Sequence, residues 1–309
     1  MPRSTARPDG ARRFRLLGAP FDGASTLGWP GSRYAPERIR SAMGWILQRR
    51  EDERIYSVDL GTTLPYPEDL LVDGGDLATV AHDLDATIDA VSAGVRETLD
   101  SGRTPVVLGG DDSLLYPVAR GLSEHAEDVG GTVAVIHCDA HLDLMDRNVQ
   151  QGTHSQSSGM RRAAELANVS TAASVQVGPR HFNFPSSLRF REEAGLRCVP
   201  AAEVHRRGVD AVCDDVLDHV GGADRVLLAF DIDCIDPAHA PGAGALEPGG
   251  FTSHQALELV RRLAPRVDAM VLTEVNPMTD RNDQTAILGA YLVSTVVVHA
   301  NAAAAGEGH

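Results

Sequence analysis

Four apolar runs in this chain each end in acidic side chains. The runs TPVVLGG, TVAVIHC, RVLLAF and DAMVLT lead into Asp111 and Asp112, Asp139, Asp231, and Glu274 respectively. Because each run is continuously apolar rather than alternating, it is predicted to be a strand buried on both faces. Longer amphipathic segments separate the runs, a pattern typical of parallel βαβ units. We therefore predict an α/β fold with a mostly parallel central sheet between helix layers, and a ligand site beyond the carboxyl ends of its strands.

The alternation of strands and helices extends over nearly the whole chain. The predicted strands are Phe14–Pro20, Thr104–Gly110, Thr132–Asp139, Ser174–Arg180, Arg225–Asp231 and Asp268–Pro277, and the predicted helices are Ala35–Leu47, Leu77–Leu99, Leu114–His125, Arg161–Asn168, Val209–Val220, Ser253–Leu263 and Gln284–Ala300. Ser253 is the expected N-cap of its helix. No break rich in Pro, Ser or charge divides the chain, so we expect a single domain over residues 14–303. We expect residues 1–13 to form a disordered tail and residues 304–309 a flexible one.

Composition narrows the classes of partner. The net charge of −15 disfavours nucleic acid and anionic membranes as partners, and it suits a small cationic substrate. No run of about 20 apolar residues occurs, so no transmembrane helix is expected. The four cysteines form no C-x-x-C pair and lie in or near apolar stretches, which indicates free thiols and a cytoplasmic location.

The spacing of the acidic side chains indicates a metal site. Alternate side chains share a face in extended backbone, so Asp231 and Asp233 are predicted to converge, as are Asp139, His141 and Asp143. Two like unit charges about 4 Å apart cost on the order of 4 kcal/mol at an effective dielectric near 20. No lysine or arginine within these motifs balances the charge, so divalent cations are the expected partners. Carboxylates with one or two imidazoles suit Mn²⁺, and several carboxylates able to bridge indicate two ions, about 3.5–4 Å apart.

Each of these aspartates also has a purely structural alternative. A single aspartate at a strand end is more often a turn residue or a helix N-cap than a metal ligand. We expect that role for Asp111, through bonds to nearby backbone, and it is the alternative for Asp112 at the start of the helix LLYPVARG. Separate clusters at three strand ends make it the less favoured interpretation for the set as a whole.

Longer motifs resemble those of the ureohydrolases, the arginase–agmatinase family, and lie nearer the agmatinase branch. GAPFDGASTLGWPGSRYAPERIR is similar to the N-terminal signature of that branch, and HCDAHLDL to its D-A-H-x-D metal motif. DIDCIDPAHAPGAGALEPGG resembles the D-x-D…DP…APG block, and TEVNP resembles the segment with the guanidinium-binding Glu. The match runs from about Phe14 to about His299. It implies the three-layer α/β/α arginase-like fold.

The resemblance implies an enzyme that hydrolyses a guanidino compound to urea and an amine, with two Mn²⁺ per chain. Agmatine, 4-guanidinobutyrate or a larger guanidino metabolite would be the substrate. By motif position, Asp139 and Asp231 would bridge the ions. His141 and Asp233 would complete one ion, and Asp143 would bind the other. A bridging hydroxide, acidified by both ions, would attack the guanidinium carbon.

The same resemblance assigns the contacts to the organic part of the substrate. Glu274 would hold the guanidinium by charge-assisted hydrogen bonds, and Asp143 would carry a proton to the departing amine. In one of the family's specificity loops, Arg180, His181 and Asn183 would be available to a polar or carboxylate tail. The family also implies a homo-oligomer, either a trimer or a hexamer.

Two positions depart from the family pattern. Where G-G-D-H-S supplies a metal-binding His, this chain has GGDDS, which places the shorter and more negative Asp112 there. Since oxygen ligands still suit Mn²⁺, we expect Asp112 to bind the more exposed ion, or that ion to be weak or absent. In the loop GTHSQSSGMRRA, Gln156 takes the place of a family His. Its amide can hydrogen-bond a substrate but cannot shuttle a proton; His154 would substitute if the loop shifts, and otherwise it is a solvated loop residue.

Two other functions stay open beside guanidine hydrolysis. One is removal of a formimidoyl group from an amino acid on the same scaffold, with which the loss of the loop His is compatible. The other is a non-catalytic family member with an incomplete metal site. Release of formamide instead of urea distinguishes the first, and binding of one ion or none favours the second.

Overall fold

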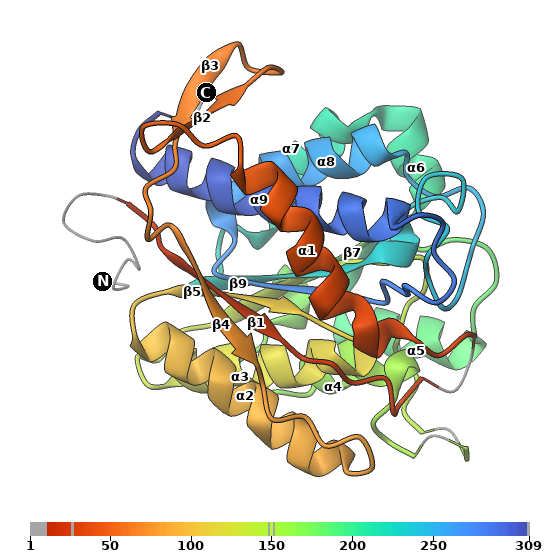
Figure 1. Cartoon of the computed structure of the whole chain (residues 1–309). Coiled ribbons are helices and arrows are strands. Elements are labelled where there is room, and N and C mark those ends of the chain that lie inside the picture. Colours follow the sequence, from red (N-terminus) through yellow and green to blue (C-terminus); the bar gives the residue numbers. More distant parts are fainter. Residues whose placement is uncertain (1–10, 26–27, 148, 151, 308–309) are drawn as a thin grey trace.

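The structure, a computed structural model, describes residues 11–25, 28–147, 149–150 and 152–307. These residues form one parallel sheet of eight strands in the order β4-β1-β5-β10-β9-β6-β7-β8 (Figure 1). The strands are β1 (Phe14–Gly18), β4 (Leu71–Asp76), β5 (Thr104–Leu108), β6 (Val133–Cys138), β7 (Val175–Val177), β8 (Arg197–Val199), β9 (Arg225–Asp231) and β10 (Ala269–Thr273). The predicted parallel sheet is confirmed.

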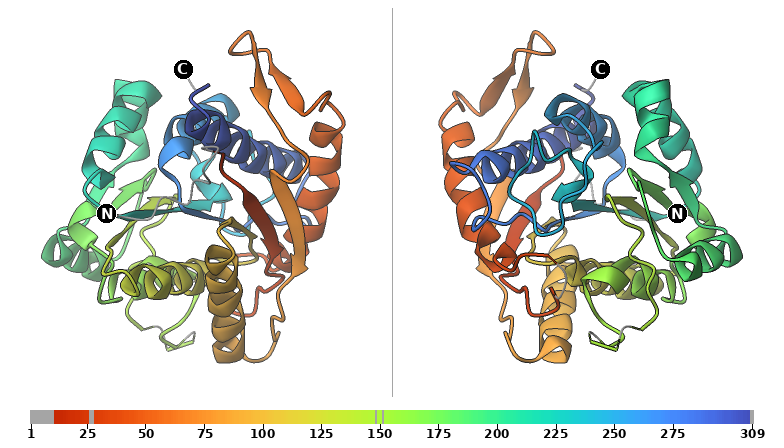
Figure 2. Two further views of the ribbon diagram at one scale, coloured as in Figure 1. Left: turned by 90° about the vertical axis from the view of Figure 1, so that its left-hand side faces the viewer. Right: turned by 90° about the vertical axis from the view of Figure 1, so that its right-hand side faces the viewer.

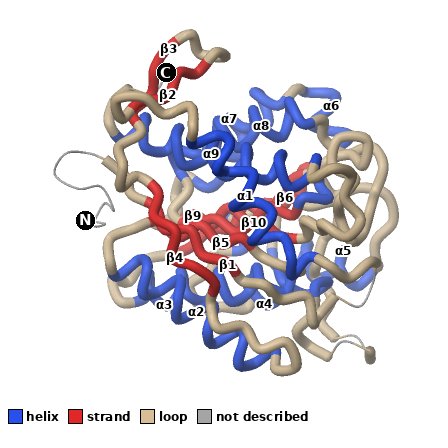
Figure 3. The backbone as a smooth tube through the Cα atoms, viewed as in Figure 1, coloured by secondary structure: helices blue, strands red, loops and turns tan. Residues whose placement is uncertain are grey.

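Two helix layers enclose the sheet, as the turned views of Figure 2 and the secondary-structure colours of Figure 3 show. The helices are α1 (Ala35–Leu47), α2 (Leu84–Asp100), α3 (Leu115–Glu127), α4 (Gly159–Ala164), α5 (Pro185–Ala194), α6 (Ala201–Arg207), α7 (Val209–Val220), α8 (Ser253–Leu263) and α9 (Gln284–Ala304). Buried side chains of α1, α7, α8 and α9 pack on one face of the sheet, in a cluster with Leu16 and Val106. Buried side chains of α2, α3 and α4 pack on the other face, in a cluster with Leu17 and Val107. Successive strand residues therefore enter opposite cores, which explains why the strands are apolar without alternation.

Capping side chains decide where two of the helices begin. The Thr252 hydroxyl accepts a hydrogen bond from the Gln255 amide at 3.1 Å, and the Gln255 side chain accepts one from the Thr252 amide at 3.0 Å. This capping box makes Thr252 the N-cap of α8, so the assignment of that role to Ser253 was wrong. Asp83 caps α2 by accepting from the Ala86 amide at 2.9 Å, so this helix begins seven residues after the predicted start at Leu77.

Short or polar elements were missed by the sequence analysis. β4 has the sequence LVDGGD and lies at an exposed edge of the sheet, and β8 has three residues. The antiparallel hairpin of β2 (Arg54–Ser57) and β3 (Thr62–Pro65) stands outside the main sheet, at the top of Figure 1. α5 and α6 were missed as well. These elements bury few side chains, so they lack the apolar pattern on which the predictions depended.

The two ends of the predicted domain require adjustment. Arg12 falls within the predicted N-terminal tail but is 7% exposed, and its amide donates to Asn301 Oδ1 at 3.1 Å. α9 continues to Ala304, one residue past the predicted boundary. Contrary to expectation, α9 is long and apolar enough to qualify as a membrane span by length and composition, but 67% of its most apolar window is buried in the protein, as in a core helix. Residues 1–10 and 308–309 of the predicted tails lie outside the described residues.

Candidate metal centre

Four neighbouring strands at the centre of the sheet bring the acidic side chains together. Asp112 follows β5, Glu274 follows β10, Asp231 ends β9, and Asp139 follows β6. These strands are adjacent in the order β5-β10-β9-β6 and parallel, so their carboxyl ends meet at one edge of the sheet. All but Asp139 line one pocket there, together with His141, Asp143 and Asp233. The predicted convergence therefore occurs.

Turns, rather than extended backbone, produce this convergence. Asp231 caps a 3-10 turn over Ile232–Cys234, and its side chain accepts from the Asp233 amide at 2.7 Å. Asp143 and Glu274 have left-handed backbones, with φ of 46° and 61°. Such conformations cost on the order of 1–3 kcal/mol each and tend to occur at functional sites. The predicted alternation along extended backbone was thus wrong in geometry, although the side chains do meet.

A first group of donors consists of Asp139, His141 and Asp233, whose ligand atoms all lie within 4.8 Å of one another. His141 Nδ1 is 3.0 Å from Asp233 Oδ2 and 3.4 Å from Asp139 Oδ1. Its Nε2 lies 3.9 Å from Glu247 Oε1, beyond hydrogen-bond distance. Burial opposes charge on His141, but Asp233 and Asp139 outweigh it and raise its pKa to about 12 without metal.

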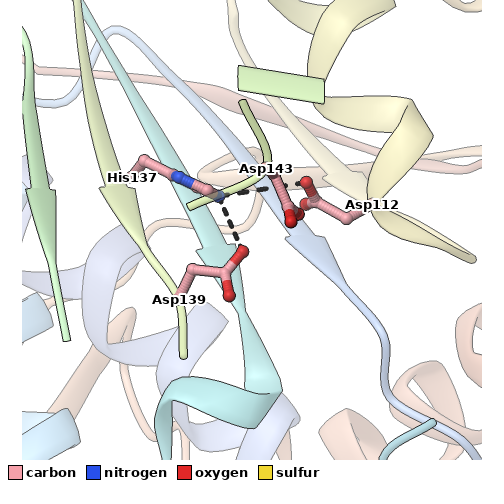
Figure 4. Close-up of side chains that lie close together, drawn as sticks. All are labelled: Asp112, His137, Asp139 and Asp143. Atoms are coloured by element: carbon pink, nitrogen blue, oxygen red, sulfur yellow. Dashed lines mark ion pairs between the residues drawn. The ribbon is translucent and has the colours of Figure 1, made fainter. Parts of the chain in front are cut away.

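A second group, shown in Figure 4, consists of Asp112, His137, Asp139 and Asp143, again within 4.8 Å of one another. His137 Nε2 lies 2.9 Å from Asp139 Oδ2 and 3.9 Å from Asp112 Oδ2. These three buried atoms make no hydrogen bond of conventional geometry with any described residue. Buried carboxylate oxygens that lack hydrogen bonds and point into the same small space would be stabilised by a cation bound there. The residues present therefore fit divalent ions.

Electrostatics of the metal-free site support the same conclusion. Burial, followed by repulsion from neighbouring carboxylates, raises the pKa of four of its acids well above the usual range: Asp112, Asp143, Asp231 and Glu274. Burial also acts to raise the pKa of Asp139, but His137 and His141 outweigh it and lower that pKa. Without cations the site therefore favours the protonated form of these four acids, and divalent ions would compete with those protons.

His137 is the residue that the sequence analysis missed. It precedes Asp139 by two positions, the same spacing used to group Asp139 with His141, and it pairs in register with Gln176 of β7. The Gln176 amide nitrogen donates to the Leu142 carbonyl at 2.7 Å and lies 3.1 Å from His137 Nδ1. Because the carbonyl can only accept, the amide presents N–H to both partners, so Nδ1 accepts and the ring hydrogen is on Nε2. His137 thus directs a donor at Asp139 and is a positioning residue.

Asp112 is 1% exposed, but each of the two groups holds one half-buried ligand, Asp143 beside Asp112 and His141 in the other group. Ligand burial therefore does not distinguish the two groups, and the assignment of Asp112 to the more exposed ion stays a prediction. Asp112 is not the cap of the following turn, because Asp111 is. Its Oδ1 accepts from Thr273 Oγ1 at 2.8 Å, which turns Oδ2 towards the cluster. Asp111 accepts from nearby backbone amides, as predicted.

The other predicted site residues divide between the pocket and its surroundings. Gln156 and Asn183 line the pocket. Arg180 and His181 are not among the lining residues: Arg180 donates to five backbone carbonyls, and His181 Nε2 lies 2.7 Å from the Pro248 carbonyl. His154 is also absent from the lining, and its ring lies 5.2 Å from that of Tyr116.

Comparison with known proteins agrees with this arrangement. The Arginase family model matches residues 12–299. The chain belongs to the arginase family. This membership confirms the resemblance read from the motifs, and with it the expected fold.

Similar proteins include several members of this family. The agmatinase of Chromobacterium violaceum is 34% identical over 90% of this chain and 80% of its own length. The guanidinobutyrase of Pseudomonas aeruginosa is 31% identical over 90% of this chain and 83% of its own. The solved structure of proclavaminate amidino hydrolase from Streptomyces clavuligerus superposes with a TM-score of 0.80 at 30% identity, over 97% of this chain and 95% of that one. Membership in the arginase family makes this chain a hydrolase of C–N bonds.

Proposed function

We propose that this chain is a Mn²⁺-dependent amidinohydrolase that cleaves a guanidino compound to urea and an amine. The observation that carries the proposal is the pairing of two donor groups, joined by Asp139, beside a pocket that also holds Glu274. An anionic guanidinium anchor and a site for two divalent ions are what this hydrolysis requires.

The two donor groups supply the ligands for the ions. Asp139, His141 and Asp233 would hold one ion, and Asp112, Asp139 and Asp143 the other. Asp231 lines the same pocket outside both groups and would be the further ligand that the family motif implies. When bound, such ions act as Lewis acids that make water a stronger acid near neutral pH. Oxygen ligands with one imidazole favour Mn²⁺ over metals that prefer thiolates.

Glu274 is the group that we assign to the guanidinium. Its Oε1 accepts a hydrogen bond from the Asp112 amide at 3.0 Å, which fixes the carboxylate and leaves Oε2 available. A Cβ atom at Gly244 would lie 2.9 Å from that Oε2, so glycine there keeps the approach open. A planar guanidinium can donate parallel N–H groups to such a carboxylate.

Asp143 is the group that we assign to proton transfer. It lines the pocket, and its backbone is held in the left-handed region, where the carbonyl accepts from the Arg161 amide at 3.0 Å. Burial and the charge of Asp139 raise its pKa in the metal-free site, which favours a carboxyl group that exchanges a proton. Gln156 offers an amide to the substrate from the same pocket.

We also propose a cytoplasmic homo-oligomer, a trimer or hexamer. All four cysteines are free, which suits a reducing compartment. Trp45, Ile287 and Tyr291 are exposed along one groove between α1 and α9, where a second copy would cover them. Light scattering of the purified protein gives the mass that decides between a monomer and these assemblies.

Metal-dependent urea release tests the proposed activity. Protein loaded with Mn²⁺ is mixed with a panel of guanidino compounds, and urea and formamide are measured separately. The proposal is supported if urea release is lost on chelation and in Glu274→Gln but is retained in the matched surface variant Glu258→Gln. Two tightly bound ions with no urea from any compound would contradict it, and formamide from a formimidoyl amino acid would favour the alternative chemistry.

A further inference from the structure

We infer that the substrate is a guanidino compound whose far end carries no carboxylate, and that Phe182 and Phe184 contact this end. The inference rests on the proposed function and adds to it the class of tail. Relatives named agmatinase and guanidinobutyrase are about equally similar to this chain, so the comparisons leave that class open.

The two ends of the pocket are lined by different kinds of side chain. The acids and His141 lie at the strand ends, and the wall towards solvent consists of apolar and neutral side chains: Leu144, Met145, Gln156, Ser157, Phe182, Asn183, Phe184, Ser187 and Ala245. No arginine occurs among these lining residues, and the whole sequence contains no lysine. A carboxylate tail would therefore find no fixed cation among the described residues of the wall.

Two arginines close to the wall in sequence, Arg180 and Arg161, are committed to other contacts, and Arg147 and Arg189 lie outside the pocket lining. Arg180 uses its guanidinium on backbone carbonyls, including those of Asp233 at 2.7 Å and Glu247 at 2.6 Å. Arg161 stacks on Phe190, with its guanidinium carbon 3.7 Å from the ring centre, and pairs with Glu165 at 2.6 Å. Recruiting either one would require breaking several of these contacts.

Two aromatic side chains at the wall are exposed in a way that calls for a ligand. Phe182 is 99% exposed and Phe184 56% exposed, and both line the pocket. Exposed aromatic rings that line a cleft belong to a binding surface more often than to a surface without a binding role. Their faces suit methylene chains, and they attract ammonium groups but not carboxylates.

The charge of the site acts in the same direction. Six carboxylates surround the pocket floor, from Asp112, Asp139, Asp143, Asp231, Asp233 and Glu274. Two divalent cations leave two negative charges in excess, one of which arises because Asp112 stands where the family has a neutral His. A guanidinium reduces this excess, whereas a carboxylate tail restores it. A tail that is cationic or uncharged is thus favoured.

A matched set of substrates tests the inference: agmatine, n-butylguanidine and 4-guanidinobutanoate. They share a four-carbon chain and differ in the charge at its far end. We expect kcat/KM for urea release to be at least tenfold higher for agmatine or n-butylguanidine than for 4-guanidinobutanoate. Equal or faster hydrolysis of 4-guanidinobutanoate would overturn the inference while leaving the proposed function intact.

Substitution of the wall residues gives a second, independent readout. Phe182→Arg places a cation at a fully exposed position, where folding tolerates it, and is expected to shift the agmatine to 4-guanidinobutanoate ratio at least tenfold towards the acid. Tyr56→Arg, at an exposed site on β2, is the matched control and should leave the ratio unchanged. An unchanged ratio in folded Phe182→Arg and Phe184→Arg would remove both rings from the site and overturn the inference.

Absence of turnover on all three compounds would count against the proposed function itself. Calorimetric binding of the same compounds to the Mn²⁺-loaded protein then decides the inference separately. Weakest binding by 4-guanidinobutanoate supports it, and tightest binding by that compound overturns it.

Discussion

The two donor groups of the metal site differ in how their polar atoms are paired before any ion binds. In the group around His141, the imidazole lies between Asp139 and Asp233 and partly neutralises them. In the group around Asp112, the His137 imidazole faces Asp139 at 2.9 Å, but Asp112 Oδ2 is 3.9 Å from that ring and has no conventional hydrogen bond among the described residues. The first group can exist without metal at modest cost, whereas the second relies on protons or on an ion.

The difference shows what the Asp112 substitution does. An imidazole in that place would be neutral, whereas a carboxylate adds a charge to the Asp112 side of the site. The added charge increases attraction for a divalent ion and also increases the cost of the empty state. The Asp112 side should therefore depend more strongly on metal than the His141 side does.

Loss of a ligand on the His141 side should have the largest effect on activity. Asp233→Asn keeps the shape of the side chain but removes a charge that faces both His141 and the pocket. We expect kcat to fall by about 1,000-fold, comparable to the loss of a strong electrostatic group in other active sites. Urea release measured beside metal content checks this, and retention of more than a tenth of the activity would contradict the assignment of Asp233.

Removal of the metal should have the next largest effect, on stability. The stabilisation by a ligand present at 1,000 times its Kd is about 4 kcal/mol, so chelation should lower Tm by several degrees. Scanning calorimetry of metal-loaded and chelated protein measures this difference. No change on chelation would mean that the site is not loaded in the folded protein.

The loss on chelation should also depend on pH. In the metal-free protein the pKa values of Asp112, Asp231 and Glu274 are raised, chiefly by burial. The stability that their bound protons contribute is fully present below the ordinary carboxyl pKa and is lost as pH rises through the raised values. The Tm difference between loaded and chelated protein should therefore be larger at about pH 8 than at about pH 5, and the reverse order would contradict this account.

Asp112→Asn tests the Asp112 side directly and should have a smaller effect. The amide keeps the bond from Thr273 but offers a neutral oxygen to the ion. We expect one of the two ions to bind about 10–100-fold more weakly while the other is retained, as calorimetric titration with Mn²⁺ would show. Equal weakening of both ions would erase the distinction between the two groups.

The smallest effect is expected for the support of Asp139. Gln176→Leu removes the amide that fixes the His137 ring, and His137→Phe removes the donor itself. Each should weaken Mn²⁺ binding by roughly tenfold without changing the number of bound ions, which is the smaller effect typical of a residue that orients a ligand without touching the ion. A full loss of one ion in His137→Phe would instead make His137 a ligand, and pulsed EPR of bound Mn²⁺ detects that nitrogen directly.

Much of the frame was predictable from apolar patterning, because both sheet faces are buried. The limits of α1, α7 and α8 match the predictions residue for residue. β4 and β8 escaped because the first is polar and the second has three residues.

The site was predictable only in its members, not in its geometry. Asp231 was grouped with Asp233 from their spacing, and Asp139 with His141 and Asp143, but the turns that bring such side chains together depend on side-chain bonds such as that from the Asp233 amide to Asp231. His137 shares a strand face with Asp139, so the spacing argument extended by one step would have found it. Gln176 is recognisable only from the register between β6 and β7.

Asp139 belongs to both donor groups, and this sharing has a consequence for how the enzyme is assembled. An ion that engages one oxygen of Asp139 alters the position and charge of the other, so occupancy of each position changes the affinity of its neighbour. By thermodynamic reciprocity the change is the same in both directions. The active fraction of the enzyme will thus follow the cellular metal supply through a coupled two-step equilibrium. A plot of that fraction against metal concentration will differ in shape from the curve for one independent site.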